Sequence, residues 1–226
     1  MNKLRSQPSR SKPRSEFTGF TLVELLSVIA ILALVATFAV PALNTVLKGT
    51  QMTQAGQLIS SQLELARQLA LSRNHSVEVR LYQYGDPGMP GEQASSPGTG
   101  NYRAVQTFDI QDSGSAVALG NAKVLPSSII IDSGTTLSSM IGGATSTTMP
   151  QFATGASLNV PVSSIGTQYN CVFFRFLPDG STNIPTSQVF LTLHNINDGK
   201  ALTNPPPNFI TIQIDSINGH LKTFRP

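Results

Sequence analysis

Three patterns of hydrophobic and polar residues follow one another along this chain, and each predicts a different kind of element. The first is a run of 23 residues without a charged side chain, from Leu25 to Leu47. As an α-helix this run would be about 35 Å long, enough to cross the roughly 30 Å hydrocarbon core of a bilayer. It also exceeds the roughly 7–15 apolar residues of a secretory signal peptide. We therefore predict a transmembrane helix over residues 20–47.

The second pattern is a helical stripe in which apolar residues recur at spacings of three or four. Glu64, Arg67 and Gln68 fall off this stripe. The spacing predicts an amphipathic continuation of the helix over residues 48–75, ending near Asn74. The stripe consists of Met52, Ala55, Ile59, Leu63, Ala66 and Ala70.

The third pattern is alternation with a period of two, which is typical of β-strands. In residues 76–84 it places Val77, Val79 and Leu81 on one face and Glu78 and Arg80 on the other. The segments between such runs are rich in Gly, Pro, Ser and Asn and predict turns and long loops. The predicted strands are residues 76–84, 102–110, 127–132, 169–177, 188–195, 209–215 and 220–224, the last two joined by a turn at Asn218-Gly219.

A long N-terminal helix followed by antiparallel strands predicts the α+β class. The predicted organisation has four parts. They are a basic leader over residues 1–19, a transmembrane helix over 20–47, its amphipathic continuation over 48–75, and an exported β-rich domain over 76–226.

The basic charge of the chain lies mainly in its first 19 residues, which hold five Lys and Arg but a single acid, Glu16. The whole chain carries a formal charge of +3, whereas residues 20–226 hold 10 basic and 11 acidic side chains. The balance excludes a large cationic field for nucleic acid outside the leader. A positive flank also predicts that the leader stays in the cytoplasm and that the C-terminal part is exported.

A carboxylate stands at the start of the apolar run, in the sequence Gly19-Phe20-Thr21-Leu22-Val23-Glu24. An acid next to a membrane-inserted segment is costly, which makes Glu24 a functional candidate. Taken alone, the position of Glu24 is equally compatible with a hydrated side chain at the membrane interface.

The residues from Gly19 to Glu24 resemble the prepilin cleavage motif of type IV pilins and type II secretion pseudopilins. The resemblance implies that a prepilin peptidase cuts after Gly19 and methylates the new N-terminus on Phe20. It assigns to Glu24 the assembly glutamate, which pairs with the N-terminal amine of a neighbouring subunit, and to Pro41 the helix proline. A buried acid needs such a cationic partner, and Pro41 removes one helix hydrogen bond and allows a kink.

Within this family, the chain is similar to GspH/FimT-type minor pseudopilins. The similarity rests on residues 63–74, on the turn at Phe176-Leu177-Pro178-Asp179-Gly180, and on the terminal hairpin around Gly219. It implies a pilin-like fold and a structural subunit of a type II secretion pseudopilus or a type IV pilus-like filament. An alternative is a filament-tip subunit that contacts DNA, a secreted protein or a surface.

The resemblance also implies where the protein works and with which partners. It would be a single-pass protein of the bacterial inner membrane, with its C-terminal domain in the periplasm or outside the cell in a filament. Its partners would be the prepilin peptidase and N-methyltransferase, other pilin or pseudopilin subunits, the inner-membrane assembly platform and the lipid bilayer. The chain is not expected to be an enzyme or to hold a cofactor.

Catalytic and metal-binding patterns are absent from the sequence. His75, His194 and His220 are scattered and form no HExxH motif. The lone Cys171 has no partner for a disulfide or a CxxC site, and its strand-like surroundings favour a small buried apolar residue. We therefore predict no metal site from these side chains.

Two segments in the last part of the sequence are candidate binding sites. Asn195, Asn197 and Asp198 could contribute oxygen ligands to a calcium loop, although the turn role of Asp198-Gly199 is favoured. His220, Lys222 and Arg225 form a small basic end that could contact nucleic acid. Three cations give little phosphate affinity, so a solvated strand end is favoured.

Overall fold

The computed structural model describes residues 19–89, 92, 99–143, 169–184 and 189–226, but not the side chains of residues 39–45 and 142–143. The chain divides into two compact units, Met1–Thr45 and Val46–Pro226. We call them the N-terminal unit and the C-terminal unit. The predicted leader, residues 1–19, lies outside the described residues except for Gly19.

The first helix, α1, extends over Leu22–Arg73 and has 52 residues. It ends where the sequence predicts, because Asn74 takes the left-handed conformation that stops a helix, with φ 57°. In the N-terminal unit the described apolar side chains of α1 are exposed along the helix. Within the described part of the chain, no helix is both long and apolar enough to span a membrane.

In the C-terminal unit, α1 buries the predicted stripe against a sheet. All six stripe residues, Met52, Ala55, Ile59, Leu63, Ala66 and Ala70, have no exposed surface. Gly56 lies on the same side, and a Cβ placed there would come within 2.7 Å of Cδ1 of Ile210. The glycine therefore permits a close approach between helix and sheet.

The sheet of the C-terminal unit contains nine described strands, and every pairing in it is antiparallel. The main path has the order β6-β1-β2-β5-β7-β8-β9, and β3 and β4 pair with β2 outside this path. The strands are β1 (Ser76–Tyr84), β2 (Asn101–Ile110), β3 (Ala116–Ala118), β4 (Lys123–Val124), β5 (Ile129–Ile131), β6 (Asn170–Phe176), β7 (Val189–Asn195), β8 (Ile210–Ile214) and β9 (Leu221–Phe224). A short helix, α2 (Ser139–Gly143), and a 3₁₀ turn, Ile196–Asp198, complete the described elements. The α+β prediction is confirmed.

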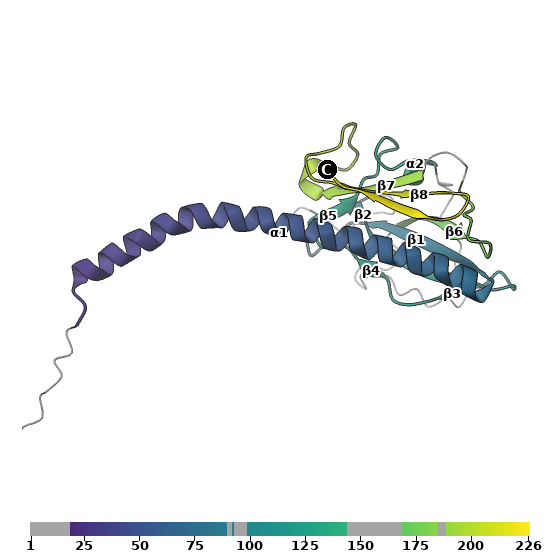
Figure 1. The fold of residues 1–226 in the computed structure, drawn as a ribbon, viewed down its shortest axis with the longest axis horizontal. Helices are drawn as coiled ribbons and strands as arrows, with labels where there is room; N and C mark the ends of the chain where they lie inside the picture. Colours follow the sequence, from purple (N-terminus) through teal and green to yellow (C-terminus); the bar gives the residue numbers. More distant parts are fainter. Residues whose placement is uncertain (1–18, 90–91, 93–98, 144–168, 185–188) are drawn as a thin grey trace, which may run out of the picture. The chain divides into compact units, whose positions relative to one another are not determined.

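The turn after β6 and the turn after β8, which belong to opposite ends of the strand order, are in contact beside α1. The backbone N–H of Thr182, after β6, donates to the carbonyl of Ser216, after β8, at 2.9 Å. Gly219 lies against the carbonyl of Gly180, so closely that a Cβ at Gly219 would lie 2.4 Å from that oxygen. Although β6 and β8 are far apart in the strand order, these contacts bring the turns that follow them together beside α1 (strands labelled in Figure 1). We call this contact between the two turns the interlock.

The second face of β1 is buried as well, which the alternating pattern does not indicate. Glu78 and Arg80 are 1% and 3% exposed. Arg80 Nε donates to Glu78 at 2.6 Å, Arg175 Nε donates to the other carboxylate oxygen at 2.9 Å, and Arg80 stacks over the Phe108 ring at 3.9 Å. These contacts satisfy charges that would otherwise be costly to bury.

A small second core continues along this face. Tyr82, Tyr84, Ala104, Tyr169 and Cys171 form one buried cluster, against which Ala122 packs from the segment between β3 and β4. Burial raises the pKa of the Cys171 thiol to about 12. The prediction that Cys171 is a small buried residue is confirmed.

Candidate processing and assembly site

The residues that precede α1 are open to solvent. Gly19 and Phe20 are exposed, Phe20 to 86%, and they belong to no helix or strand. A Cβ placed at Gly19 would meet no atom within 4 Å. The peptide bond between these residues therefore lies on an accessible segment, as a cleavage site requires.

Glu24 closes the first turn of α1 through a capping box with Thr21. Thr21 Oγ1 accepts a hydrogen bond from the Glu24 backbone N–H at 3.2 Å. In return, Glu24 Oε2 accepts from the Thr21 N–H at 2.9 Å and from its hydroxyl at 2.8 Å. This reciprocal arrangement satisfies backbone donors that the start of a helix leaves free.

The capping box is a local role for Glu24 that the sequence interpretation missed. The signal was present, because a threonine three residues before a glutamate, followed by an apolar run, is the pattern of a capping box. Both bonds that Glu24 accepts use Oε2, and within the described residues Oε1 accepts none. The capped carboxylate therefore keeps one oxygen free to accept a further hydrogen bond.

Beyond the capping box, the N-terminal unit presents apolar side chains all round α1. The described ones are between 47% and 79% exposed, as in Leu22, Val28 and Phe38. Pro41 lies within α1, but its side chain is outside the described part, so its predicted role in bending the helix stays a prediction. The exposed side chains in full are Leu22, Val23, Leu25, Leu26, Val28, Ile29, Ile31, Leu32, Leu34, Val35 and Phe38.

The predicted basic end lies on and beside the edge strand β9. His220 and Lys222 are exposed, and the Lys222 ammonium lies 4.9 Å from the centre of the Phe224 ring. Arg225 Nη1 donates to Thr53 Oγ1 on α1 at 2.7 Å. A contact of these residues with nucleic acid stays a prediction.

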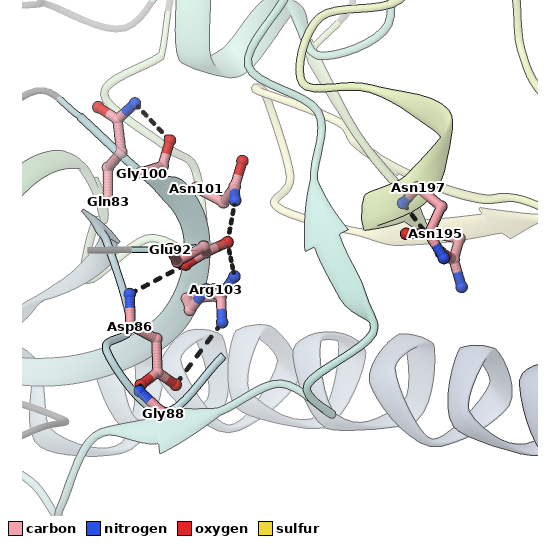
Figure 2. A network of polar contacts seen from close by, with 9 residues as sticks. All are labelled: Gln83, Asp86, Gly88, Glu92, Gly100, Asn101, Arg103, Asn195 and Asn197. Carbon is pink, nitrogen blue, oxygen red and sulfur yellow. Dashed lines mark hydrogen bonds and ion pairs between the residues drawn. The ribbon is translucent and has the colours of Figure 1, made fainter. Parts of the chain in front are cut away.

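Of the residues considered as possible calcium ligands, Asn195 and Asn197 take part in local structure, in line with the favoured turn role. Asn195 caps the 3₁₀ turn Ile196–Asp198, since its side-chain oxygen accepts from the Asn197 N–H at 3.0 Å (Figure 2). His194 is fully buried and bonds Asp132 at 3.0 Å. Among the described residues, no three His, Cys, Asp or Glu side chains gather as a metal site would require.

A polar network that the sequence did not predict closes the base of the loop between β1 and β2 (Figure 2). Glu92 accepts hydrogen bonds from Asn101 at 2.7 Å and from Arg103 at 2.6 Å through one oxygen. Its other oxygen accepts from the Asp86 N–H at 2.9 Å. Arg103 is nearly buried, so the network holds the two ends of this loop together with a charged pair.

The N-terminal segment is of the prepilin type. Residues 14–40 match the prokaryotic N-terminal methylation motif, a range that includes the predicted cleavage residues, the capping box and the first turns of α1. This match confirms the resemblance to the type IV pilin and pseudopilin family that the residues from Gly19 to Glu24 predict. Among curated proteins, none matches the chain.

Two solved structures are similar to the chain at 11% sequence identity. One is the minor pseudopilin EpsH from the type 2 secretion system of Vibrio cholerae, with a TM-score of 0.42 over 78% of this chain and 98% of that one. The other is the type IV minor pilin FimU of Pseudomonas aeruginosa strain PAO1, with a TM-score of 0.41 over 78% and 93% of the two chains.

Proposed function

We propose that the protein is made as a prepilin, cut after Gly19, methylated on Phe20, and assembled through α1 into a pilus-like filament. In this proposal it is a minor subunit of the GspH/FimT type, in a type II secretion pseudopilus or a type IV pilus-like filament. The observation that carries the proposal is the methylation motif over residues 14–40, within which Gly19 and Phe20 are exposed just before a capped apolar helix. The role is structural and uses no catalytic residue or cofactor.

Before assembly, the precursor would be a single-pass protein of the inner membrane. The uncharged run from Leu25 to Leu47 and the basic leader support this orientation, with the leader in the cytoplasm and the C-terminal unit exported. The partners would be the prepilin peptidase and N-methyltransferase, the assembly platform, and other pilin or pseudopilin subunits. The exposed apolar side chains of α1 support this, because burying one such side chain stabilises an assembly by about 1.5–3 kcal/mol.

Glu24 would act twice in this scheme, first within its own chain and then between chains. The capping box holds the carboxylate at the first turn of α1 and engages only Oε2. The other oxygen would accept a hydrogen bond from the N-terminal amine on Phe20 of a neighbouring subunit. Such a charge-assisted bond in an apolar filament core would fix the axial register of assembly.

Three variants separate the two roles of Glu24. Glu24→Gln keeps a side chain that can complete the capping box but removes the charge, whereas Glu24→Ala removes both. Thr21→Val removes the capping hydroxyl and keeps the charge, which destabilises the start of the helix by about 1 kcal/mol. Each variant is expressed as the full-length precursor. The amount of protein in the membrane and the amount in sheared filaments are then measured and compared with those of the wild type.

We expect all three variants to insert in the membrane. Glu24→Gln and Glu24→Ala should both be lost from filaments, whereas Thr21→Val should be incorporated at close to the wild-type level. Wild-type incorporation of Glu24→Gln would reject the pairing with the amine and leave the carboxylate as a cap only.

Processing is tested by the mass of the protein extracted from its host membrane. A chain that begins at Phe20 and is heavier by one methyl group would support the proposal. An intact Met1 in a host with an active prepilin peptidase would reject it.

A further inference from the structure

Two exposed cations lie at one end of the C-terminal unit, where its part of α1 begins. Lys48 directly follows the uncharged run that ends at Leu47, and it is the first charged residue after Glu24. Arg225 comes from the opposite end of the sequence and follows the edge strand β9. Both side chains are exposed.

Two contacts define how β9 runs along α1. Thr223 Oγ1 lies 3.5 Å from Ser60 Oγ, and Arg225 Nη1 donates to Thr53 Oγ1 at 2.7 Å. From Thr223 to Arg225 the chain advances by two residues, while the contacted residue on α1 changes from Ser60 to Thr53, seven residues nearer the start of the helix. The chain therefore runs towards the start of this unit's helix, and Arg225 reaches a residue only about 7.5 Å along the axis from Lys48.

The charge at this end is positive on balance. One acid, Asp198, belongs to the same end, because the Ile196 N–H donates to the Ser128 carbonyl at 2.9 Å and Ser128 Oγ donates to Gln51 on α1. Asp198 makes no ion pair with Arg225 among the described residues. The guanidinium donates one hydrogen bond to Thr53 and has further N–H groups that face solvent.

We propose that Lys48 and Arg225 bind phosphate groups of phospholipid headgroups on the exported face of the membrane. The proposal rests on the proposed function, because it requires the uncharged run of α1 to span the bilayer. A charge directly after a spanning segment lies at the depth of the headgroups, and Lys and Arg side chains at that depth reach the phosphates. The planar guanidinium binds two phosphate oxygens at once.

The contact couples the folded C-terminal unit to the membrane surface. Lys48 alone would anchor only the helix, whose neighbouring turns could still tilt and rotate. Arg225 belongs to the far end of the sequence, and its bond to Thr53 ties β9 to α1 about one and a half turns beyond Lys48. Two phosphate contacts therefore hold the sheet against the membrane surface until the subunit is extracted into a filament.

The test uses the full processed chain in vesicles of phosphatidylcholine and phosphatidylglycerol, in phosphate-free buffer. Rotational-echo double-resonance NMR measures the proximity of ¹³Cζ of arginine to ³¹P, and of ¹⁵Nζ of lysine to ³¹P. We expect an arginine signal that dephases against ³¹P and is lost in Arg225→Gln. Arg73 is the internal control, since it lies 25 residues beyond Lys48, about 37 Å along the helix, and should not dephase.

The outcomes separate this inference from the proposed function. Resistance of the chain to alkaline extraction from the vesicles, and protection of its spanning segment from protease, report insertion independently. An inserted chain whose Arg225 signal does not dephase would overturn the phosphate contact and leave the proposed function intact. A chain that does not insert would overturn both. Because the buffer holds no phosphate, a dephased signal can come only from lipid.

Discussion

The interlock between the turns after β6 and β8 depends on Gly219, and Gly219→Ala tests it. Gly219 has a φ of +66°, and a Cβ there would lie 2.4 Å from the carbonyl oxygen of Gly180. It would also lie 3.1 Å from Cδ of Arg67 and from Cε1 of Phe176. The side chain of Arg67 can move aside, whereas the backbone oxygen cannot move without shifting its turn.

The expected loss of stability has two parts. The left-handed conformation costs a residue with a Cβ about 1–2 kcal/mol. A shift of the turn at Gly180 weakens the bond between Thr182 and Ser216, and a backbone hydrogen bond contributes about 1 kcal/mol. Gly219→Ala should therefore lower the free energy of unfolding by about 2–3 kcal/mol.

Gly114→Ala is the matched control. Gly114 has a φ of +79°, but a Cβ there would meet no atom within 4 Å. It should carry only the backbone strain, and so lose about 1–2 kcal/mol.

Urea unfolding of the full chain in detergent gives both free energies. The buried Cys171, the single cysteine of the chain, is the probe, because its thiol reacts with a disulfide reagent when the C-terminal unit opens. Equal losses for the Gly219 and Gly114 variants would refute the steric part of the reasoning and the interlock with it.

Three further predictions concern buried and turn residues. Asp132→Ala should lower the free energy of unfolding by about 3–5 kcal/mol, because it leaves Nε2 of the fully buried His194 without its partner and removes the acceptor of the Leu202 N–H. Urea unfolding checks this, with the exposed Asp112→Ala as a control expected within about 0.5 kcal/mol of wild type. Burial raises the pKa of Cys171 from 9.0 to about 12. The protonated thiol therefore contributes fully to stability below pH 9, and this contribution falls as the pH rises towards 12. If the free energy of unfolding of Cys171→Ala falls between pH 9 and 12 as much as that of the wild type, the prediction is wrong. Hydrogen bonds from the Ser181 hydroxyl and N–H lower the pKa of Asp179 below 3.8, so its contribution is present above about pH 4 and lost as pH falls; Asp179→Asn should flatten this acid limb, and an unchanged limb would argue against it.

The long helix and the longer strands could be predicted, because each of them leaves a local pattern of apolar and polar residues in the sequence. The helical stripe from Met52 to Ala70 is buried as its spacing indicates, since residues three and four apart share one face of a helix. The alternating pattern likewise predicts the position of β1, although not the burial of both its faces. The terminal hairpin follows from the turn at Asn218-Gly219, where Gly219 has the positive φ that glycine permits. The methylation motif is likewise local, because it is one contiguous segment of the sequence.

Several short elements could not be predicted, because their pairing depends on neighbours distant in the sequence. Strands β3 and β4 have only three and two residues, too few for a period to emerge, and both form by pairing with β2. The short helix α2 lies in a small-residue stretch, residues 133–155, that has no regular spacing; residues 144–155 of it are outside the described part.

The sequence by itself determined the methylation motif, the end of α1 and the face by which α1 packs on the sheet. Only the tertiary structure decided which charges are buried and which turns meet. Glu78 alternates as a surface residue would, yet it is buried because Arg80 and Arg175 neutralise it from the same and the adjacent strand. The contacts of Thr182 with Ser216 and of Arg225 with Thr53 join residues 34 and 172 positions apart. Such pairings arise from the curvature of the whole sheet, and no local pattern of residues encodes them.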